Sequence, residues 1–296
     1  MNMSPENNYK NKLDDLSTLE IINKINDEDK KIAYLVEKQL DQISKAVDLI
    51  VESFESGGRL IYVGSGTSGK LAVIDASECP PTFGIDDSMV QGIISGGNAA
   101  LSGWLEHTED DEELAIKDLK AKNVNKNDIL VGITASGNTP YVRRAMEYGK
   151  ELQCKTVGIM CSTIGRINDI CDLTISVDVG PEIIFGSTRM KAGTAQKMIL
   201  NMLSTTSMIK LGKTYLNLMV NVKPINKKLQ DRVRQIVHLA TDANTNTIDE
   251  ILNKCNYDPK IAIIVIETGL NVEEAKLMLE KYHGRVAKVL QNYNKN

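Results

Sequence analysis

Five short apolar segments, separated by stretches with helical patterns, constrain the fold of this chain more than any other feature. They span residues 59–63, 90–94, 128–134, 155–160 and 173–177. Each is a nearly unbroken apolar run, which is typical of parallel strands that are covered on both faces. The helical stretches between them supply the right-handed crossovers that parallel strands require. The sequence therefore predicts an α/β fold, a doubly wound parallel five-stranded sheet with helices on both faces.

Helical patterns also flank the predicted sheet. Apolar residues at spacings of three and four over residues 28–56 predict one long amphipathic helix that ends at Gly57. Residues 179–212 predict a second long helix with a methionine-rich face, which is more typical of core or subunit packing than of ligand binding. Those methionines are Met190, Met198, Met202 and Met208.

Three regions follow from these patterns. We expect N-terminal helices over residues 1–56 and a ligand-binding core over residues 57–220. Only helical patterns occur near the C-terminus, so residues 221–296 are predicted to form a small all-helical subdomain.

Composition narrows the class of protein. Apolar residues make up 42% of the 296 positions, so a large core can be buried, and the net charge is −4. A mildly acidic chain without an apolar run of about 20 residues indicates neither a nucleic acid nor a membrane as partner. The N-terminus has no signal-peptide pattern, and the five cysteines form no C-x-x-C motif. Together with three dispersed histidines, this favours a cytoplasmic protein without a metal site.

The segment "GSGTSGK" directly follows the first predicted strand and permits three interpretations. Its glycines fit the dinucleotide fingerprint, but the second predicted strand ends in "ISGG", without the carboxylate that would hold a ribose. A P-loop would need a hydroxyl residue after Lys70, where this chain has Leu71. What remains is a loop rich in N–H and hydroxyl groups at a helix N-terminus, which suits a phosphate monoester.

A second loop of the same kind, "TASGNTP", follows the third predicted strand. The carboxyl ends of parallel strands share one edge of the sheet, so we expect both loops to hold one small phosphorylated ligand. The candidate binding residues are Ser65, Gly66, Thr67, Ser68, Ser136, Gly137, Asn138 and Thr139.

Longer motifs resemble those of a known family. The segments "GSGTSGKLAVIDASECPPTFG", "HTEDD", "TASGNTPYV" and "GPEIIFGSTRMKAGTAQKMILNML" are similar to those of the N-acetylmuramic acid 6-phosphate etherases, relatives of the glucokinase regulatory protein. The resemblance runs from about residue 10 to the C-terminal helices. It implies a sugar isomerase (SIS) fold, a cytoplasmic homodimer and the conversion of N-acetylmuramic acid 6-phosphate and water into N-acetylglucosamine 6-phosphate and D-lactate.

The resemblance also implies a catalytic pair and no cofactor. Glu109 would remove the C2 proton of the opened sugar, and Glu78 would protonate the departing lactate. Adjacent prolines support this role for Glu78: Pro80 and Pro81 are expected to form a stiff turn poor in N–H donors, which would keep a carboxyl pKa high. Without the resemblance, Glu109 would be one charge in a solvated acidic run.

Several nearby residues keep more than one interpretation. Cys79 lacks a neighbouring histidine to activate it and is expected to be a small buried residue. His107 is expected to be a loop or cap residue, although a supporting role beside Glu109 stays open. Arg189 and Lys191 are either charges at a helix start or groups that approach the substrate from a neighbouring subunit.

Two other functions share the phosphate loops. An aldose–ketose phosphosugar isomerase would need a base but no acid at the C3 oxygen. A phosphosugar sensor would need neither, but a DNA-binding sensor should carry a basic helix-turn-helix module, and the first 30 residues are too short and acidic for one.

Overall fold

The five predicted strands form one parallel sheet. The computed structural model describes residues 13–103, 105, 107–222, 224 and 226–293, and its strand order is β2-β1-β3-β4-β5. The strands are β1 (Leu60–Gly64), β2 (Val90–Ile94), β3 (Ile129–Thr134), β4 (Lys155–Met160) and β5 (Leu173–Ser176). Every predicted strand end lies within one residue of the observed end, and the predicted fold class is confirmed.

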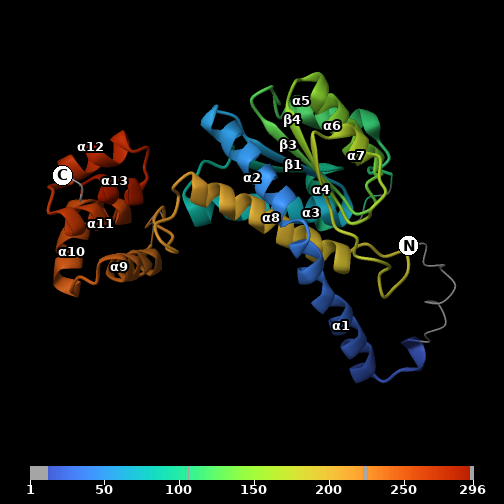
Figure 1. Cartoon of the computed structure of the whole chain (residues 1–296), viewed down its shortest axis with the longest axis horizontal. Coiled ribbons are helices and arrows are strands. Elements are labelled where there is room, and N and C mark those ends of the chain that lie inside the picture. Colours follow the sequence, from blue (N-terminus) through green and yellow to red (C-terminus); the bar gives the residue numbers. More distant parts are fainter. Residues whose placement is uncertain (1–12, 104, 106, 223, 225, 294–296) are drawn as a thin grey trace.

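Helices cover both faces of the sheet (Figure 1). On one face, side chains from α1 (Thr18–Glu37), α2 (Leu40–Glu55), α3 (Gly66–Phe83) and α8 (Lys191–Lys210) share a core with alternate strand residues. On the other face, α5 (Glu112–Ala121), α6 (Pro140–Glu151) and α7 (Ile167–Ile170) pack on the remaining strand residues, and the short α4 (Gly97–Ser102) follows β2. Burial of both sheet faces explains why the strands read as unbroken apolar runs.

Two helix predictions were wrong in their extent. The helix predicted over residues 28–56 is two helices, because α1 ends at Glu37 and α2 begins at Leu40. The helix predicted over 179–212 begins only at Lys191. Residues 179–190 form a loop instead, and the carboxylate of Glu182 in this loop accepts hydrogen bonds from the N–H groups of Lys191 and Ala192.

The C-terminal part is helical, as predicted. It comprises α9 (Lys227–Thr241), α10 (Thr245–Lys254), α11 (Pro259–Thr268), α12 (Val272–Lys281) and α13 (Val286–Tyr293), which enclose a core of their own. Figure 1 shows this group at the far end of α8 from α1. The boundaries at residues 56/57 and 220/221 stay predictions, and residues 1–12 of the expected N-terminal region lie outside the described residues. None of the helices described is long and apolar enough to cross a membrane.

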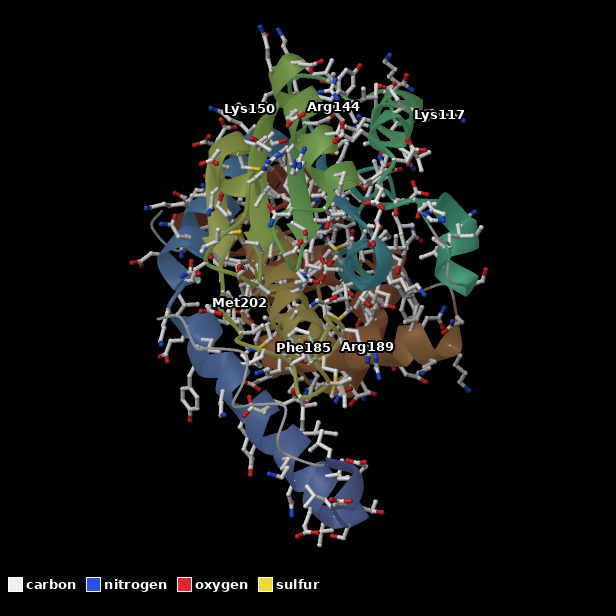
Figure 2. All side chains as sticks on the ribbon, turned by 90° about the vertical axis from the view of Figure 1, so that its right-hand side faces the viewer. Lys117, Arg144, Lys150, Phe185, Arg189 and Met202 are labelled. Atoms are coloured by element: carbon white, nitrogen blue, oxygen red, sulfur yellow. The ribbon has the colours of Figure 1, made fainter. Side chains whose placement is uncertain are left out.

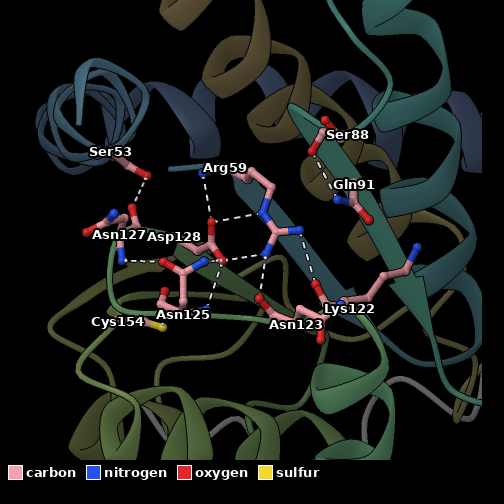
Figure 3. A network of polar contacts seen from close by, with 10 residues as sticks. All are labelled: Ser53, Arg59, Ser88, Gln91, Lys122, Asn123, Asn125, Asn127, Asp128 and Cys154. Atoms are coloured by element: carbon pink, nitrogen blue, oxygen red, sulfur yellow. Dashed lines mark hydrogen bonds and ion pairs between the residues drawn. The ribbon is translucent and has the colours of Figure 1, made fainter. Parts of the chain in front are cut away.

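A buried ion pair joins the two central strands at the edge of the sheet where they begin (Figure 3). Asp128 precedes β3, and its side chain is fully buried. It accepts bonds from the backbone N–H and the Nε of Arg59, at 2.9 and 3.0 Å, and from a second guanidinium nitrogen at 2.7 Å. These bonds raise the pKa of Arg59. Because the pair is hydrogen-bonded on both sides, it holds β1 and β3 in register.

Removal of this carboxylate should destabilise the whole sheet. We expect Asp128→Ala to lower the free energy of unfolding by about 3 kcal/mol, because Arg59 would keep a partly buried charge without its partner. Urea unfolding measures the change. Glu250→Ala, which breaks an exposed ion pair with Lys254 on α10, should have little effect. Equal losses of unfolding free energy in the two variants would show that the buried pair contributes no more stability than the exposed one.

Candidate active site

The two predicted phosphate loops lie together at the point where the winding of the sheet reverses. Ser65 follows β1, and residues 136–139 follow β3, the strand paired directly beside it. From β1 the chain crosses through α3 to β2 at one edge, whereas from β3 it crosses through α6 toward β4 and β5. In doubly wound sheets this switch point opens a crevice in which ligands bind.

The first loop is shorter than the sequence suggested, because α3 already begins at Gly66. Its first turn therefore supplies the free N–H groups and the positive dipole end that suit a phosphate. The hydroxyl of Ser68 is buried and donates to Gln196 on α8 at 2.9 Å. Ser68 can thus offer a ligand its backbone N–H, whereas its side chain fastens α3 to α8.

The second loop is held in shape by its own polar groups. The Ser136 hydroxyl accepts from the Asn138 N–H at 3.1 Å, and the Asn138 amide donates to the Ser136 carbonyl at 3.1 Å. The Asn138 side-chain oxygen accepts from the Arg166 N–H, and the Thr139 hydroxyl lies 2.8 Å from that of Thr134. Ser136 and Asn138 are nevertheless exposed at the rim.

Glu109 belongs to the same rim. Its carbonyl accepts a 3.0 Å hydrogen bond from the N–H of Tyr141, in the first turn of α6. The preceding Thr108 hydroxyl lies 3.2 Å from that of Ser95, which in turn lies 2.5 Å from that of Ser65. The segment that carries Glu109 is therefore fixed to the ends of β1 and β2 and to the start of α6. The side chain of Glu109 itself is exposed.

Ser95 and Thr108 were not among the predicted site residues. Ser95 is almost fully buried at 1% exposure and directly follows β2, so its position after a predicted strand was the available signal. Thr108 reaches it by a contact across 13 residues of chain. That contact has no signature in the local sequence.

Glu78 lies elsewhere in the chain, and the expected turn after it was wrong. Residues 66–83 form one helix that includes Pro80 and Pro81 and ends at Gly84 in a left-handed conformation. Glu78 is the twelfth residue after Gly66, so the rise of an α-helix separates the two by about 18 Å. Its side chain is exposed. Within one chain, the structure therefore does not bring Glu78 and Glu109 to the same place.

The other singled-out residues lie in different surroundings. Lys191 is buried, and its Nζ lies 2.8 Å from the carboxylate of Glu28 on α1. Arg189 is exposed in the loop before α8, near Phe185 (Figure 2). Cys79 is buried, and that burial raises the pKa of its thiol to about 12, which supports a packing role. His107 is exposed, with a left-handed φ of 68°.

Among the residues that the structure describes, no group of three or more His, Cys, Asp or Glu side chains is arranged to hold a metal ion. What the rim offers is N–H donors, hydroxyls and the carboxylate of Glu109. Such a set can bind a phosphate and move a proton.

Comparisons with known proteins identify the class of fold. The SIS domain matches residues 101–206, and the glucokinase regulatory protein N-terminal SIS domain matches residues 42–150. A phosphoheptose isomerase from Francisella tularensis superposes with a TM-score of 0.52 at 19% identity, over 66% of this chain and 100% of that one. The phosphoheptose isomerase from Neisseria gonorrhoeae gives 0.50 at 16% identity, over 64% and 98%. The chain is an SIS-fold protein.

Full-length relatives then identify the family. N-acetylmuramic acid 6-phosphate etherase from Clostridium beijerinckii is 50% identical over 279 residues, which cover 94% of this chain and 92% of the relative. The enzymes of the same name from Clostridium botulinum strain Langeland and Caldanaerobacter subterraneus are 51% and 48% identical over 94% of this chain. The chain belongs to the N-acetylmuramic acid 6-phosphate etherase family, which confirms the resemblance in its motifs.

The second loop depends on a glycine that can be tested. A Cβ on Gly137 would lie 2.8 Å from the Cα of Gly165 and from the sulfur of Met160, whereas one on Gly57 would meet nothing within 4 Å. Both glycines have a left-handed φ, so alanine at either position is strained alike. We expect Gly137→Ala to cost about 2 kcal/mol more unfolding free energy than Gly57→Ala, because only the first is overpacked. Urea unfolding of the two variants measures this difference, and equal losses would refute the close approach.

Proposed function

We propose that this protein is a carbon–oxygen lyase that cleaves the D-lactyl ether of N-acetylmuramic acid 6-phosphate, giving N-acetylglucosamine 6-phosphate and D-lactate. Near-full-length identity of about 50% to etherases carries the proposal. The site geometry supports it, because two loops suited to a phosphate flank a carboxylate at one rim. We propose that the protein works in the cytoplasm, where it would take part in cell-wall amino-sugar recycling.

Phosphate binding comes first in the proposed mechanism. The first turn of α3 and the loop at residues 136–139 converge at the switch point, where N–H groups and hydroxyls would receive the 6-phosphate. With the phosphate held there, the sugar would extend along the rim toward Glu109. The anchored backbone of Glu109 would orient its carboxylate without using the carboxylate itself.

Elimination and rehydration then follow. In the opened sugar the C3 ether oxygen is β to the C1 aldehyde, so loss of the C2 proton to Glu109 gives an enolate. The enolate expels the C3 oxygen as the C3–O bond breaks, and Glu78 protonates the departing lactate. Water adds to C3 of the unsaturated aldehyde, and a proton returns to C2. The net reaction consumes one water and needs no change of oxidation state.

Glu78 of the partner subunit completes this site in our proposal. About 18 Å of helix separates Glu78 from the phosphate-binding turn of its own α3, whereas the 6-phosphate and the C3 oxygen are separated only by part of one sugar. Exposed apolar side chains on the same layer, such as Leu19 and Ile22 on α1 and Ile74 on α3, give a second copy a surface to cover. We therefore propose a homodimer with composite sites.

Isotope exchange tests the chemistry. In deuterated water, the wild-type protein should release lactate from N-acetylmuramic acid 6-phosphate and place deuterium at C2. Glu78→Gln should keep C2 exchange and lose lactate release, because the enolate still forms but its leaving group is not protonated. Glu109→Gln should lose both. Binding without lactate or exchange in the wild type would favour the sensor, and conversion to a ketose would favour the isomerase.

Mixing the two inactive variants tests the composite site. If each site takes Glu78 from one subunit and Glu109 from the other, a heterodimer of Glu78→Gln and Glu109→Gln has one intact site. Random mixing should then restore about one quarter of the wild-type lactate rate, since half the dimers are mixed and half their sites are intact. If both glutamates act from one chain, the mixture should stay inactive.

A further inference from the structure

A buried polar cluster lies between α3 and α8, away from the phosphate loops. Its centre is Asp75 on α3, which is 7% exposed. One carboxylate oxygen accepts from the amide of Asn201 at 2.6 Å and from the hydroxyl of Ser204 at 3.2 Å, both on α8. The hydroxyl of Tyr62 on β1 is a further donor beside this carboxylate and acts to lower its pKa, against the effect of burial. Burial raises the pKa of Asp75, so the carboxylate is costly to keep.

Stability alone does not account for this carboxylate. A whole buried polar group of partners can commonly be replaced by well-packed apolar side chains without loss of stability, whereas removal of one partner leaves the others unpaired. A carboxylate that is held in a native core by neutral donors alone therefore calls for another explanation. Asp75 lies one helical turn before Glu78, and residues three apart are neighbours along a helix. The explanation that we pursue is therefore an effect of Asp75 on the position of Glu78.

The turn that carries Glu78 has a weakened hydrogen-bond ladder. Pro80 and Pro81 have no N–H, so neither can donate to the carbonyl four residues earlier, on Ala76 or Ser77. These two interrupted positions enclose Glu78. The backbone of this turn is held less firmly by its own helix than the first turns of α3, and an external anchor would compensate.

Helix α8 supplies anchors at two levels of α3. Near the phosphate loop, Ser68 bonds to Gln196, and one turn before Glu78, Asp75 bonds to Asn201 and Ser204. The two levels lie on the same pair of helices. The bonds at both levels together hold α3 in place on α8, from its phosphate-binding first turn to the turn before Glu78.

We propose that Asp75 is a positioning residue: its bonds to Asn201 and Ser204 hold the turn of α3 that aims Glu78 at the leaving lactate oxygen. The proposal rests on the proposed role of Glu78 as the acid. Asp75 touches no substrate and transfers no proton. Its loss should slow the protonation of lactate and leave the earlier C2 proton transfer unchanged.

The test is Asp75→Leu in the isotope-exchange assay. We expect lactate release to fall at least about tenfold, because a small misplacement of an acid has that order of effect. The KM and the rate of C2 exchange should stay within about twofold of wild type, so the ratio of exchange to lactate rises. The free energy of unfolding should fall, because the Asn201 amide and the buried Ser204 hydroxyl lose their acceptor, so the ratio of exchange to lactate, which a merely structural role would not change, is the deciding readout.

Two further variants keep the test decisive. Asp128→Asn alters the other buried aspartate, in the ion pair with Arg59, and should lower stability without changing the ratio of exchange to lactate. Asn201→Ala removes the shorter bond from a half-buried position, so it should raise the ratio about threefold even if Asp75→Leu fails to fold.

The outcomes distinguish a failure of the positioning role of Asp75 from a failure of the proposed function. If Glu78→Gln loses lactate release but keeps exchange, while Asp75→Leu and Asn201→Ala both behave as wild type, the positioning role is refuted and the proposed function stands. A parallel fall of exchange, lactate release and stability in the Asp75 variant would also refute it. If Glu78→Gln itself leaves lactate release unchanged, the proposed function fails at its acid.

Discussion

The close packing of α3 on the sheet is the constraint on which the site depends. A Cβ on Gly64 or on Gly69 would lie 2.6 Å from its nearest atom, and one on Gly92 of β2 would lie 2.7 Å from Val73. Side chains at these positions would push α3 away from β1 and β2, because a core at native density cannot absorb such contacts. The glycines thus determine how closely α3 packs on the sheet. This close packing places the N-terminal turn of α3 beside the loop that follows β3.

The same helix carries two functional ends, and its length has a consequence for the assembly. Its first turn faces the switch point, and Glu78 lies about 18 Å further on. A rigid helix cannot fold back to bring these ends together. In our proposal one sugar phosphate therefore meets the first turn of α3 in one chain and Glu78 of the partner subunit. The bonds from α3 to α8 matter because a site shared by two subunits depends on the direction in which α3 points.

The sequence was most informative where local patterns coincide with burial or with backbone chemistry. Strands were predicted to within one residue because both faces of the sheet are buried, and the loops because glycines and hydroxyls directly follow β1 and β3. The break between α1 and α2 was missed because the apolar spacing continues through Lys38 and Gln39 without glycine or proline. The start of α8 was missed because Glu182, nine residues earlier, caps it through a loop contact.

The prolines of α3 show most clearly why local rules failed. By local chemistry Pro80 and Pro81 predict a turn, but the structure continues the helix through both. Contacts from α8 at Asp75 lie just before them, and Gly84 closes the helix just after them through a bond to the Pro80 carbonyl. Tertiary anchoring of this kind overrides local preference, and it involves residues more than 120 positions apart.

Two buried aspartates of this protein illustrate different uses of a costly group. Both oxygens of Asp128 are bonded, to Arg59 and to the Asn125 amide, at the edge of the sheet where strands begin. That pair is satisfied and serves the fold. Asp75 has neutral donors instead, chiefly the Asn201 amide and the Ser204 hydroxyl of α8, and it lies on the helix between the phosphate loop and the proposed acid. In a turn weakened by two prolines, this anchor to α8 is explained in our proposal by the geometry that it imposes on Glu78.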